Sequence, residues 1–153
     1  MEEVRLAATD DGPRLAVLLA QSLGDLAFLR GGPTLVGPLT ADELLGRWLA
    51  PESATSVFVG SYEDAVVGLL AVTTFTRPGA AGPSGRIEWC YVEEDARGVG
   101  VGTALMEAAV AWCAELGCVD IDALALPGDR STKQRLEAAG FTARLLVLNR
   151  RLD

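Results

Sequence analysis

Three glycines at alternate positions, Gly98, Gly100 and Gly102, separate two apolar stretches and constrain the fold of this chain more than any other feature. Residues 86–92 before them are typical of a β-strand, and residues 102–116 after them of a helix covered on most sides. Glycine adopts dihedral angles closed to other residues and lets the backbone pass close to a ligand. The helix that follows presents free N–H groups and the positive end of its dipole. The segment therefore predicts an anion-binding site.

Other known designs for binding phosphate fit this segment less well. A Walker loop is excluded because it needs a Gly-Lys pair, and the only lysine is Lys133. A dinucleotide fingerprint, typical of an oxidoreductase, normally follows the first strand, whereas these glycines follow an acidic turn deep in the chain. Asp120 or Asp122 does lie roughly twenty residues on, as a ribose ligand would. A strand-to-helix turn without any ligand is a further alternative.

The rest of the chain predicts an α/β fold in one domain over residues 1–153, because its length suits a single core. Strands that first pair antiparallel and later alternate with helices favour one mixed central sheet with helices on both faces. The Gly- and Pro-rich stretch 30–39 is a candidate lid. Strands are expected over residues 4–8, 56–62, 66–77, 86–92, 118–126 and 141–152, and helices over 14–29, 40–50, 102–116 and from Asp129 or Ser131 to Gly140.

Composition excludes several classes of function. Lys and Arg total 13 against 21 Asp and Glu, a net charge of −8 that argues against nucleic-acid binding. The chain has no His, which excludes Ser-His and Cys-His nucleophiles, and three Cys at unrelated spacings, so neither a disulfide framework nor a metal site is expected. No signal segment or membrane-spanning run is evident, so we expect a cytoplasmic protein without membrane partners. Twelve arginines against one lysine suggest a bacterial origin.

The glycine segment resembles the Arg-x-x-Gly-x-Gly loop of the GCN5-related N-acetyltransferase (GNAT) family, here Arg97 to Gly102. The preceding strand has the form Ile-Glu-x-x-Tyr-Val, and Leu-Glu-Ala-Ala-Gly-Phe at 136–141 follows in the order and spacing of the family. The resemblance covers nearly the whole chain. It implies a mostly antiparallel sheet, splayed between the strand before the glycine loop and the next one. It also implies an acyltransferase that moves acetyl from acetyl-CoA to a primary amine.

The resemblance further implies a set of cosubstrate-binding residues and needs no metal. The diphosphate of acetyl-CoA would lie on the amides of Gly98, Val99, Gly100, Val101, Gly102 and Thr103, with Arg97 nearby to add a charge-assisted contact. The pantetheine arm would pair with the preceding strand at Cys90, Tyr91 and Val92 as an added strand does.

Glu88 is the candidate general base, since an amine must lose a proton before or during attack on the thioester. It lies four residues before Val92, where similar enzymes often carry a base, and strand alternation places Glu88, Cys90 and Val92 on one face. Partial burial in a cleft would raise the pKa of its carboxyl toward the working range of a base. The alternatives are that Glu88 only pairs with Arg86, or that the base is in the acidic turn 93–95. Without a neighbouring His, Cys90 is expected to be a packed side chain and not a nucleophile.

Two departures from the family pattern bear on activity. Leu136 stands where relatives commonly hold a Tyr that protonates the departing thiolate, so water, Ser131 or Tyr91 would have to substitute. Asp129 replaces an Asn and is expected to cap a helix. An alternative function is therefore a catalytically weakened acyl-CoA-binding sensor or partner-binding module on the same fold.

The acceptor is the part of the function that these residues do not specify. Residues 26–39 and the final strand are expected to shape its pocket, and an amine on a small molecule or a peptide fits them equally well. Only residues 142–153 follow the Gly-Phe pair, where relatives usually have two strands. The acceptor site is therefore expected to be either more open or completed by a second subunit of a homodimer.

Overall fold

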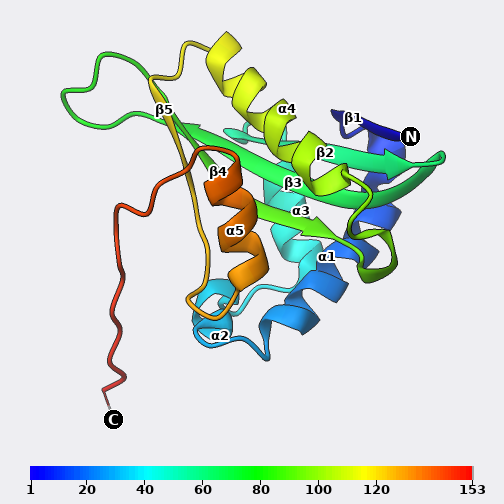
Figure 1. The fold of residues 1–153 in the computed structure, drawn as a ribbon, viewed down its shortest axis with the longest axis horizontal. Coiled ribbons are helices and arrows are strands. Elements are labelled where there is room, and N and C mark those ends of the chain that lie inside the picture. The colour runs from blue at the N-terminus through cyan, green and yellow to red at the C-terminus, as the bar shows by residue number, and fades with distance from the viewer. Residues whose placement is uncertain (153) are drawn as a thin grey trace.

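The computed structural model describes residues 1–152 and contains one five-stranded sheet in the order β1-β2-β3-β4-β5. The first four strands pair antiparallel and β5 pairs parallel to β4 (Figure 1). The strands are β1 (Glu2–Leu6), β2 (Thr55–Tyr62), β3 (Ala65–Phe75), β4 (Ser84–Val92) and β5 (Asp120–Ala123). The helices are α1 (Gly12–Leu26), α2 (Gly32–Val36), α3 (Ala41–Leu49), α4 (Val101–Glu115) and α5 (Arg130–Ala138), with single 3₁₀ turns η1 (Thr9–Asp11) and η2 (Glu94–Ala96).

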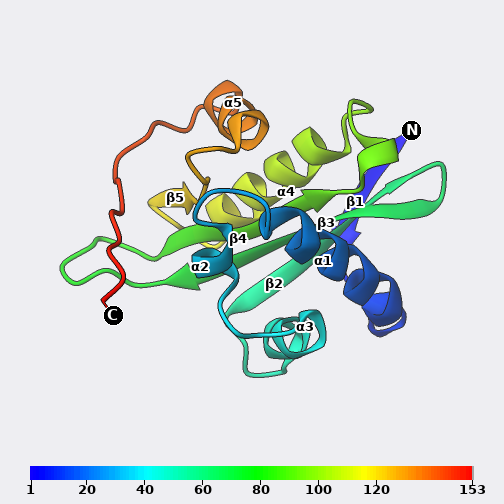
Figure 2. The same cartoon turned by 90° about the horizontal axis from the view of Figure 1, so that it is seen from below.

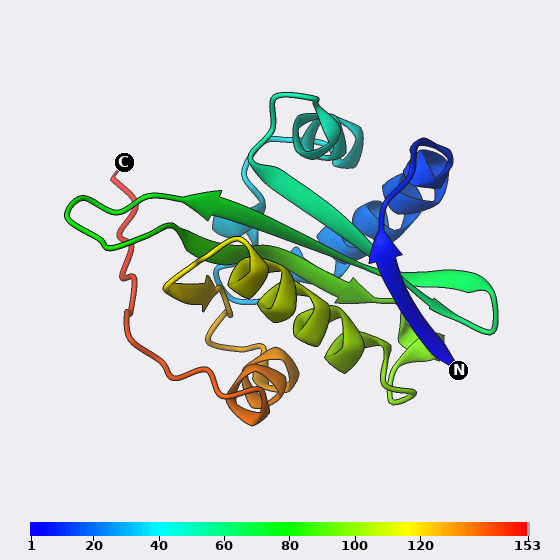
Figure 3. The same ribbon diagram turned by 90° about the horizontal axis from the view of Figure 1, so that it is seen from above.

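Helices cover both faces of the sheet, as the sequence predicts (Figures 2 and 3). The apolar stripe of α1 places Leu15, Leu18 and Leu19 in one core layer, where α3 adds Leu45 and Trp48. Helix α4 is apolar over most of its surface and packs on the opposite face. The fold is thus the mixed α/β sheet that was predicted, with a core on each side.

Two glycines of the sheet bring α4 close to its strands. A Cβ on Gly60 would lie 2.6 Å from Val101 Cγ1, and one on Gly68 would lie 3.2 Å from Leu105 Cδ1. Because no side chain intervenes, the first turns of α4 rest directly on β2 and β3. This contact fixes the position of the N-terminus of α4, which carries the glycine segment.

The sheet splays between β4 and β5, as the family resemblance implies. The two strands pair only over Ser84–Ile87 and Asp120–Ala123. The register between β3 and β4 shifts between Ala71 and Val72, because Val72 pairs with Ile87 and Ala71 with Trp89, so Glu88 is the extra residue of a bulge in β4. Beyond the bulge, residues 89–92 pair with β3 alone, which leaves their other edge open. A bulge re-aims the strand it interrupts, and such irregularities are common next to active sites.

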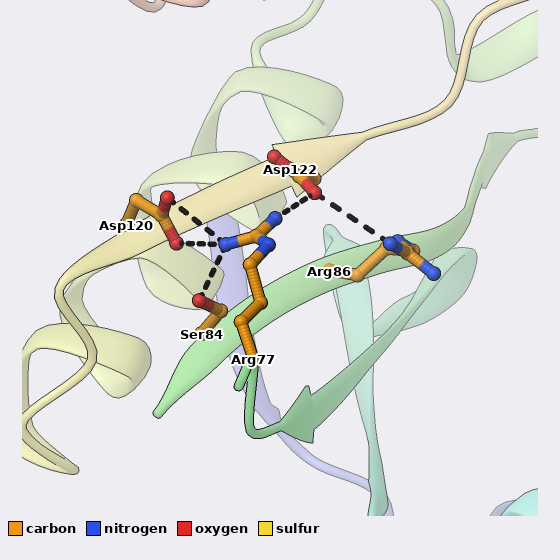
Figure 4. A network of polar contacts seen from close by, with 5 residues as sticks. All are labelled: Arg77, Ser84, Arg86, Asp120 and Asp122. Atoms are coloured by element: carbon orange, nitrogen blue, oxygen red, sulfur yellow. Dashed lines mark hydrogen bonds and ion pairs between the residues drawn. The ribbon is translucent and has the colours of Figure 1, made fainter. Parts of the chain in front are cut away.

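A polar network holds the paired ends of β4 and β5 together (Figure 4). Arg77 donates to Ser84 Oγ at 2.6 Å and to Asp120 Oδ1 at 2.7 Å, and its other terminal nitrogen binds Asp122. Arg86 lies 3.6 Å from the same Asp122 carboxylate. These contacts tie the end of β3 to both strands, so the strands are fastened at one end and open at the other.

The structure corrects several predicted boundaries. Residues 141–152, predicted to be mostly a strand, form no strand, and the side chains of Leu145 to Leu148 are at least 74% exposed. An apolar run becomes a strand only where an edge pairs with it, and this segment pairs with no strand of the sheet. Strand β5 covers only four of the nine residues predicted for it, 118–126. The candidate lid contains the short helix α2, and α1 ends at Leu26 instead of residue 29.

Candidate acyl-transfer site

A cleft of about 450 Å³ follows the opening between β4 and β5. Its floor is the part of β4 from Ile87 to Cys90 together with Val92. One wall is residues 123–126, which continue from β5, and α5 closes the side next to α4. At the opposite end the cleft reaches the last turn of α1 and Leu35 of α2. Elements far apart in sequence thus converge where the sheet splays.

The glycine segment forms the turn from η2 into α4 with two residues in the left-handed region. Gly98 has φ 88° and Gly100, the N-cap of α4, has φ 95°. The N–H groups in the first turn of a helix have no intrahelical partner, and here no side chain caps them either. The side chains of Val99 and Val101 pack toward the core, and Thr103 is exposed. This segment therefore offers a ligand mainly backbone N–H groups and few side-chain contacts.

Arg135 is a site residue that sequence analysis missed. A Cβ on Gly102 would lie 3.0 Å from Arg135 Nη1 and 3.2 Å from Cζ, so the guanidinium lies against the first turn of α4. Arg135 also lines the cleft, whereas no residue from Gly98 to Thr103 does. The side chain therefore joins the glycine segment to the cleft. Its position on α5 gave no signal, because an Arg on an exposed helix normally indicates only a solvated face.

Arg97 lies at the mouth of the cleft but is engaged by the protein itself. Its Nε donates to the carbonyl of Val92 at 3.0 Å, and Nη2 lies 3.4 Å from Asp25 Oδ2. Its guanidinium also lies 5.7 Å from the centre of the Tyr91 ring. In this arrangement, Arg97 fixes the end of β4 and the last turn of α1 relative to the glycine segment. Of the two arginines at the mouth, Arg135 is the one that faces the first turn of α4.

Glu88 lies in the cleft at the bulge of β4, half-buried. Burial raises the pKa of its carboxyl above the ordinary value, and the nearby charge of Arg86 opposes that rise. The strict alternation predicted from Glu88 to Val92 is interrupted here. Cys90 and Val92 do share the α4 face of the sheet, as predicted, whereas Glu88 stands at the irregularity. A partly desolvated carboxylate in a cleft has the environment that a general base requires.

The acidic turn 93–95 does not reach into the cleft as a group. Glu93 pairs with Arg14 of α1 at 2.8 Å, and Arg14 also donates to the carbonyl of Val66. Glu94 borders the cleft but is exposed, and so is Asp95. The turn therefore connects α1 to the end of β4.

Leu136 and Asp129, the two departures from the family pattern, have structural roles. Leu136 is 6% exposed and belongs to the α4 core, so its position offers no proton donor. Asp129 accepts from Thr132 N at 3.2 Å and from Thr132 Oγ1 at 2.7 Å, which confirms it as the cap of α5. Ser131 lines the cleft and Tyr91 does not.

Cys90 and Tyr91 lie on opposite faces of β4. Cys90 packs with the α4 layer and Tyr91 with the α1 and α3 layer. Burial raises the pKa of the Cys90 thiol to about 11, although the charge of Arg135 opposes the rise. A thiol with that pKa is protonated at neutral pH and is a poor nucleophile.

The described residues contain neither a metal-binding cluster nor a membrane-spanning helix. Among residues 1–152, no three or more His, Cys, Asp or Glu side chains are grouped as they would be around a metal ion. In the same part of the chain, no helix has the length and apolar character needed to cross a membrane.

Comparison with known proteins identifies the class to which this fold and site correspond. The model of the acetyltransferase (GNAT) family matches residues 28–141, which is well over half of the chain. The chain therefore belongs to the GNAT acetyltransferase family. Comparison with curated proteins gave no match.

Solved structures share the fold over their full length at low sequence identity. A ribosomal-protein-alanine N-acetyltransferase from Brucella melitensis biovar Abortus 2308 superposes with a TM-score of 0.76 at 17% identity, with 100% of both chains covered. A transcriptional regulator from Bacillus halodurans C-125 superposes with a TM-score of 0.78 at 21% identity, over 99% of this chain and 100% of that one. An aminoglycoside acetyltransferase from an uncultured soil metagenomic sample, in complex with sisomicin, superposes with a TM-score of 0.73 at 18% identity. The superposition covers 99% of this chain and 95% of that one. At these identities the likeness establishes the fold alone.

Proposed function

We propose that this protein transfers the acetyl group of acetyl-CoA directly to the primary amine of a small molecule or peptide. The observation that carries the proposal is the open edge of β4 from Glu88 to Val92, which leads to the uncapped N-terminus of α4 beside Arg135. The two parts suit the two ends of one cosubstrate. An extended amide-containing arm can pair with an open strand edge, and a diphosphate suits a helix N-terminus next to a guanidinium.

The residues present fit acetyl-CoA through their backbone more than their side chains. The amides of Gly98 to Thr103 would receive the diphosphate, and Arg135 would supply a charge beside Gly102. Backbone groups at Cys90, Tyr91 and Val92 would pair with the pantetheine arm. Arg97 would hold that end of β4 in place through its bond to the Val92 carbonyl.

The chemistry needs a proton acceptor near the thioester carbonyl, and we assign that role to Glu88. The amine nitrogen forms a C–N bond to the acetyl carbon, the C–S bond breaks, and the electron pair leaves on the CoA sulfur. The proton lost by the amine goes to Glu88, directly or through water, and its raised pKa suits that transfer. The thiolate takes a proton from water or from Ser131, because Leu136 has none to give.

Calorimetric titration of acetyl-CoA into the purified protein tests the proposal. We expect micromolar binding to the wild-type protein and loss of binding in Gly100→Trp, whose side chain would fill the turn. Gly79→Trp is the matched control, because Gly79 also has a positive φ but lies in the turn between β3 and β4. Circular dichroism verifies that both variants are folded.

The outcomes separate the candidate functions. Binding followed by thiol release with an amine supports the transferase. Binding without turnover toward any amine favours the acyl-CoA-binding module, for which the buried Leu136 is the specific observation. Tighter binding of NAD(P) than of CoA, or no binding at all, contradicts both functions. The homodimer, the cytoplasmic location and the bacterial origin stay predictions.

A further inference from the structure

The two ends of the cleft differ in chemical character. At the end near α4, its lining includes Arg97, Arg135 and the polar first turn of α5. At the end near α1 and α2, Ser22 and Asp25 of α1 are the polar lining residues and the others are apolar. Leu126 packs there, 3.4 Å from the Cβ position of Gly31. The apolar end is formed by Leu26, Phe28, Leu29, Leu35, Leu124 and Leu126.

Several of these apolar side chains are exposed to solvent. Phe28 is 93% exposed, Leu124 48% and Leu35 36%, although all three line one cleft. They come from separate segments, namely the turn after α1, the chain after β5, and α2. Large apolar side chains that gather around a concave site without covering one another mark a surface that a ligand completes.

The carboxylates of the cleft leave one half-buried negative charge near the apolar end. Asp129 caps α5, Asp25 pairs with Arg97, and Glu94 is exposed at the mouth. Glu88 forms no hydrogen bond or ion pair within residues 1–152 and stands beside Trp89 on the cleft floor. Trp89 donates its N–H to the hydroxyl of the buried Ser22 at 2.8 Å, which pairs these two polar groups with each other.

From this arrangement we infer that the acceptor is a small primary amine with one positive charge on an aromatic or branched aliphatic body. The inference rests on the proposed function and names its substrate class. The ammonium group would lie at Glu88, and the apolar body would lie among Phe28, Leu35 and Leu124. Glu88 first takes one proton from the ammonium group, which leaves a neutral nitrogen with a lone pair. That nitrogen attacks the acetyl carbon, and as the C–N bond forms and the C–S bond breaks, its second proton passes through water to the departing thiolate, so the amide product carries no charge.

The same arrangement disfavours other acceptors of the family fold. A polyamine or an aminoglycoside would bring further ammonium groups against a largely apolar wall, where Asp25 is already paired with Arg97 and Asp129 already caps α5. An amino acid would bring a carboxylate close to Glu88, where like charges repel. A short amine such as ethylamine would satisfy Glu88 but leave the apolar side chains uncovered.

The experiment compares amines of different body and charge under saturating acetyl-CoA, with thiol release as the readout. Phenethylamine and isoamylamine are expected to give kcat/KM values at least about tenfold above those of ethylamine, spermidine and sisomicin, since small differences in apolar contact give discrimination of that order. Phe28→Ser is expected to raise KM for phenethylamine by about tenfold. In calorimetry, the same variant binds acetyl-CoA as the wild-type protein does.

Leu116→Ser is the matched control, because Leu116 is 50% exposed at the end of α4 and does not line the cleft. This substitution is expected to leave KM and kcat/KM unchanged for every amine. Preference for spermidine or sisomicin, with acetyl-CoA binding intact, overturns this inference and leaves the proposed function standing. Equal effects of Phe28→Ser and Leu116→Ser also overturn it. If acetyl-CoA does not bind, the proposed function fails and the acceptor class fails with it.

Discussion

The guanidinium of Arg135 lies against Gly102, with Nη1 3.0 Å from the position that a Cβ at Gly102 would occupy. A cation at the N-terminus of a helix opposes the helix dipole unless an anion lies between them. In the proposed complex, the diphosphate of acetyl-CoA supplies that anion. Two groups that repel each other in the free protein would then bind one ligand together.

Replacing Arg135 by Ala is expected to weaken acetyl-CoA binding about tenfold or more, because hydrogen bonds to charged groups each contribute about 1.5–3 kcal/mol. The loss should shrink at high salt, since screening reduces the contact with the diphosphate. Arg130→Ala on the same helix is the control, because Arg130 is exposed and does not line the cleft. Calorimetry at two salt concentrations measures both effects, and equal affinities of the two variants would contradict the assignment.

Gly102→Ala should displace the Arg135 side chain, because a Cβ at 3.0 Å from Nη1 is closer than ordinary contact. Affinity for acetyl-CoA is therefore expected to fall severalfold. Gly46→Ala in α3 meets nothing within 4 Å and should instead stabilise the fold by about 0.5–1 kcal/mol through helix propensity. Titration and thermal melting of both variants check the contrast. An unchanged affinity in Gly102→Ala would show that Arg135 does not set the binding site.

Glu88→Gln is expected to lower kcat by about 10² to 10⁴-fold, the range typical of a general base, and to leave acetyl-CoA affinity unchanged. In the wild-type enzyme, the raised pKa of Glu88 should place the acid limb of the kcat/KM profile above the titration range of a free carboxyl group. Activity then rises with pH through that limb. A wild-type rate in the variant would exclude the role.

The same substitution should raise the stability of the protein near neutral pH. The pKa of Glu88 is higher in the folded chain than in the unfolded chain, so its favourable contribution holds below the unfolded pKa and is lost as pH rises through the folded pKa. Glutamine stays neutral and avoids that loss. The difference in melting temperature between Glu88→Gln and the wild-type protein should therefore grow from acid to neutral pH. A constant difference would argue against a desolvated carboxyl group.

The charge of Arg86 acts on the pKa of Glu88, so removal of that charge should shift the pH profile of the reaction. The charge of Arg86 lowers the pKa of Glu88 against the effect of burial, so Arg86→Gln should move the acid limb of kcat/KM to higher pH. Arg47→Gln, an exposed change on α3, is the control for loss of one positive charge. Because Arg86 also contacts Phe75 and Asp122, melting temperatures should be recorded alongside. A limb that stays in place would show that Arg86 is only structural.

Local patterns in the sequence determined most of the elements and the glycine segment at which we propose that the cosubstrate binds. The glycines at 98 and 100 do adopt the left-handed conformation that their spacing suggests, and the helix predicted over 40–50 begins at Thr40, which forms a capping box with Glu43. Asp129 caps α5 as predicted. These features could be predicted because each depends on interactions within a few residues of chain.

Only the tertiary structure decided which residues meet in the cleft. The bulge at Glu88, the guanidinium of Arg135 at Gly102 and the presence of Phe28 and Leu124 in one cleft all depend on packing between distant segments. The run 141–152 has the composition of a strand, yet it forms none, because a strand needs a partner edge that composition does not supply. The sequence by itself therefore determined the family loop and the local elements, whereas long-range packing decided the electrostatics and the apolar end of the site.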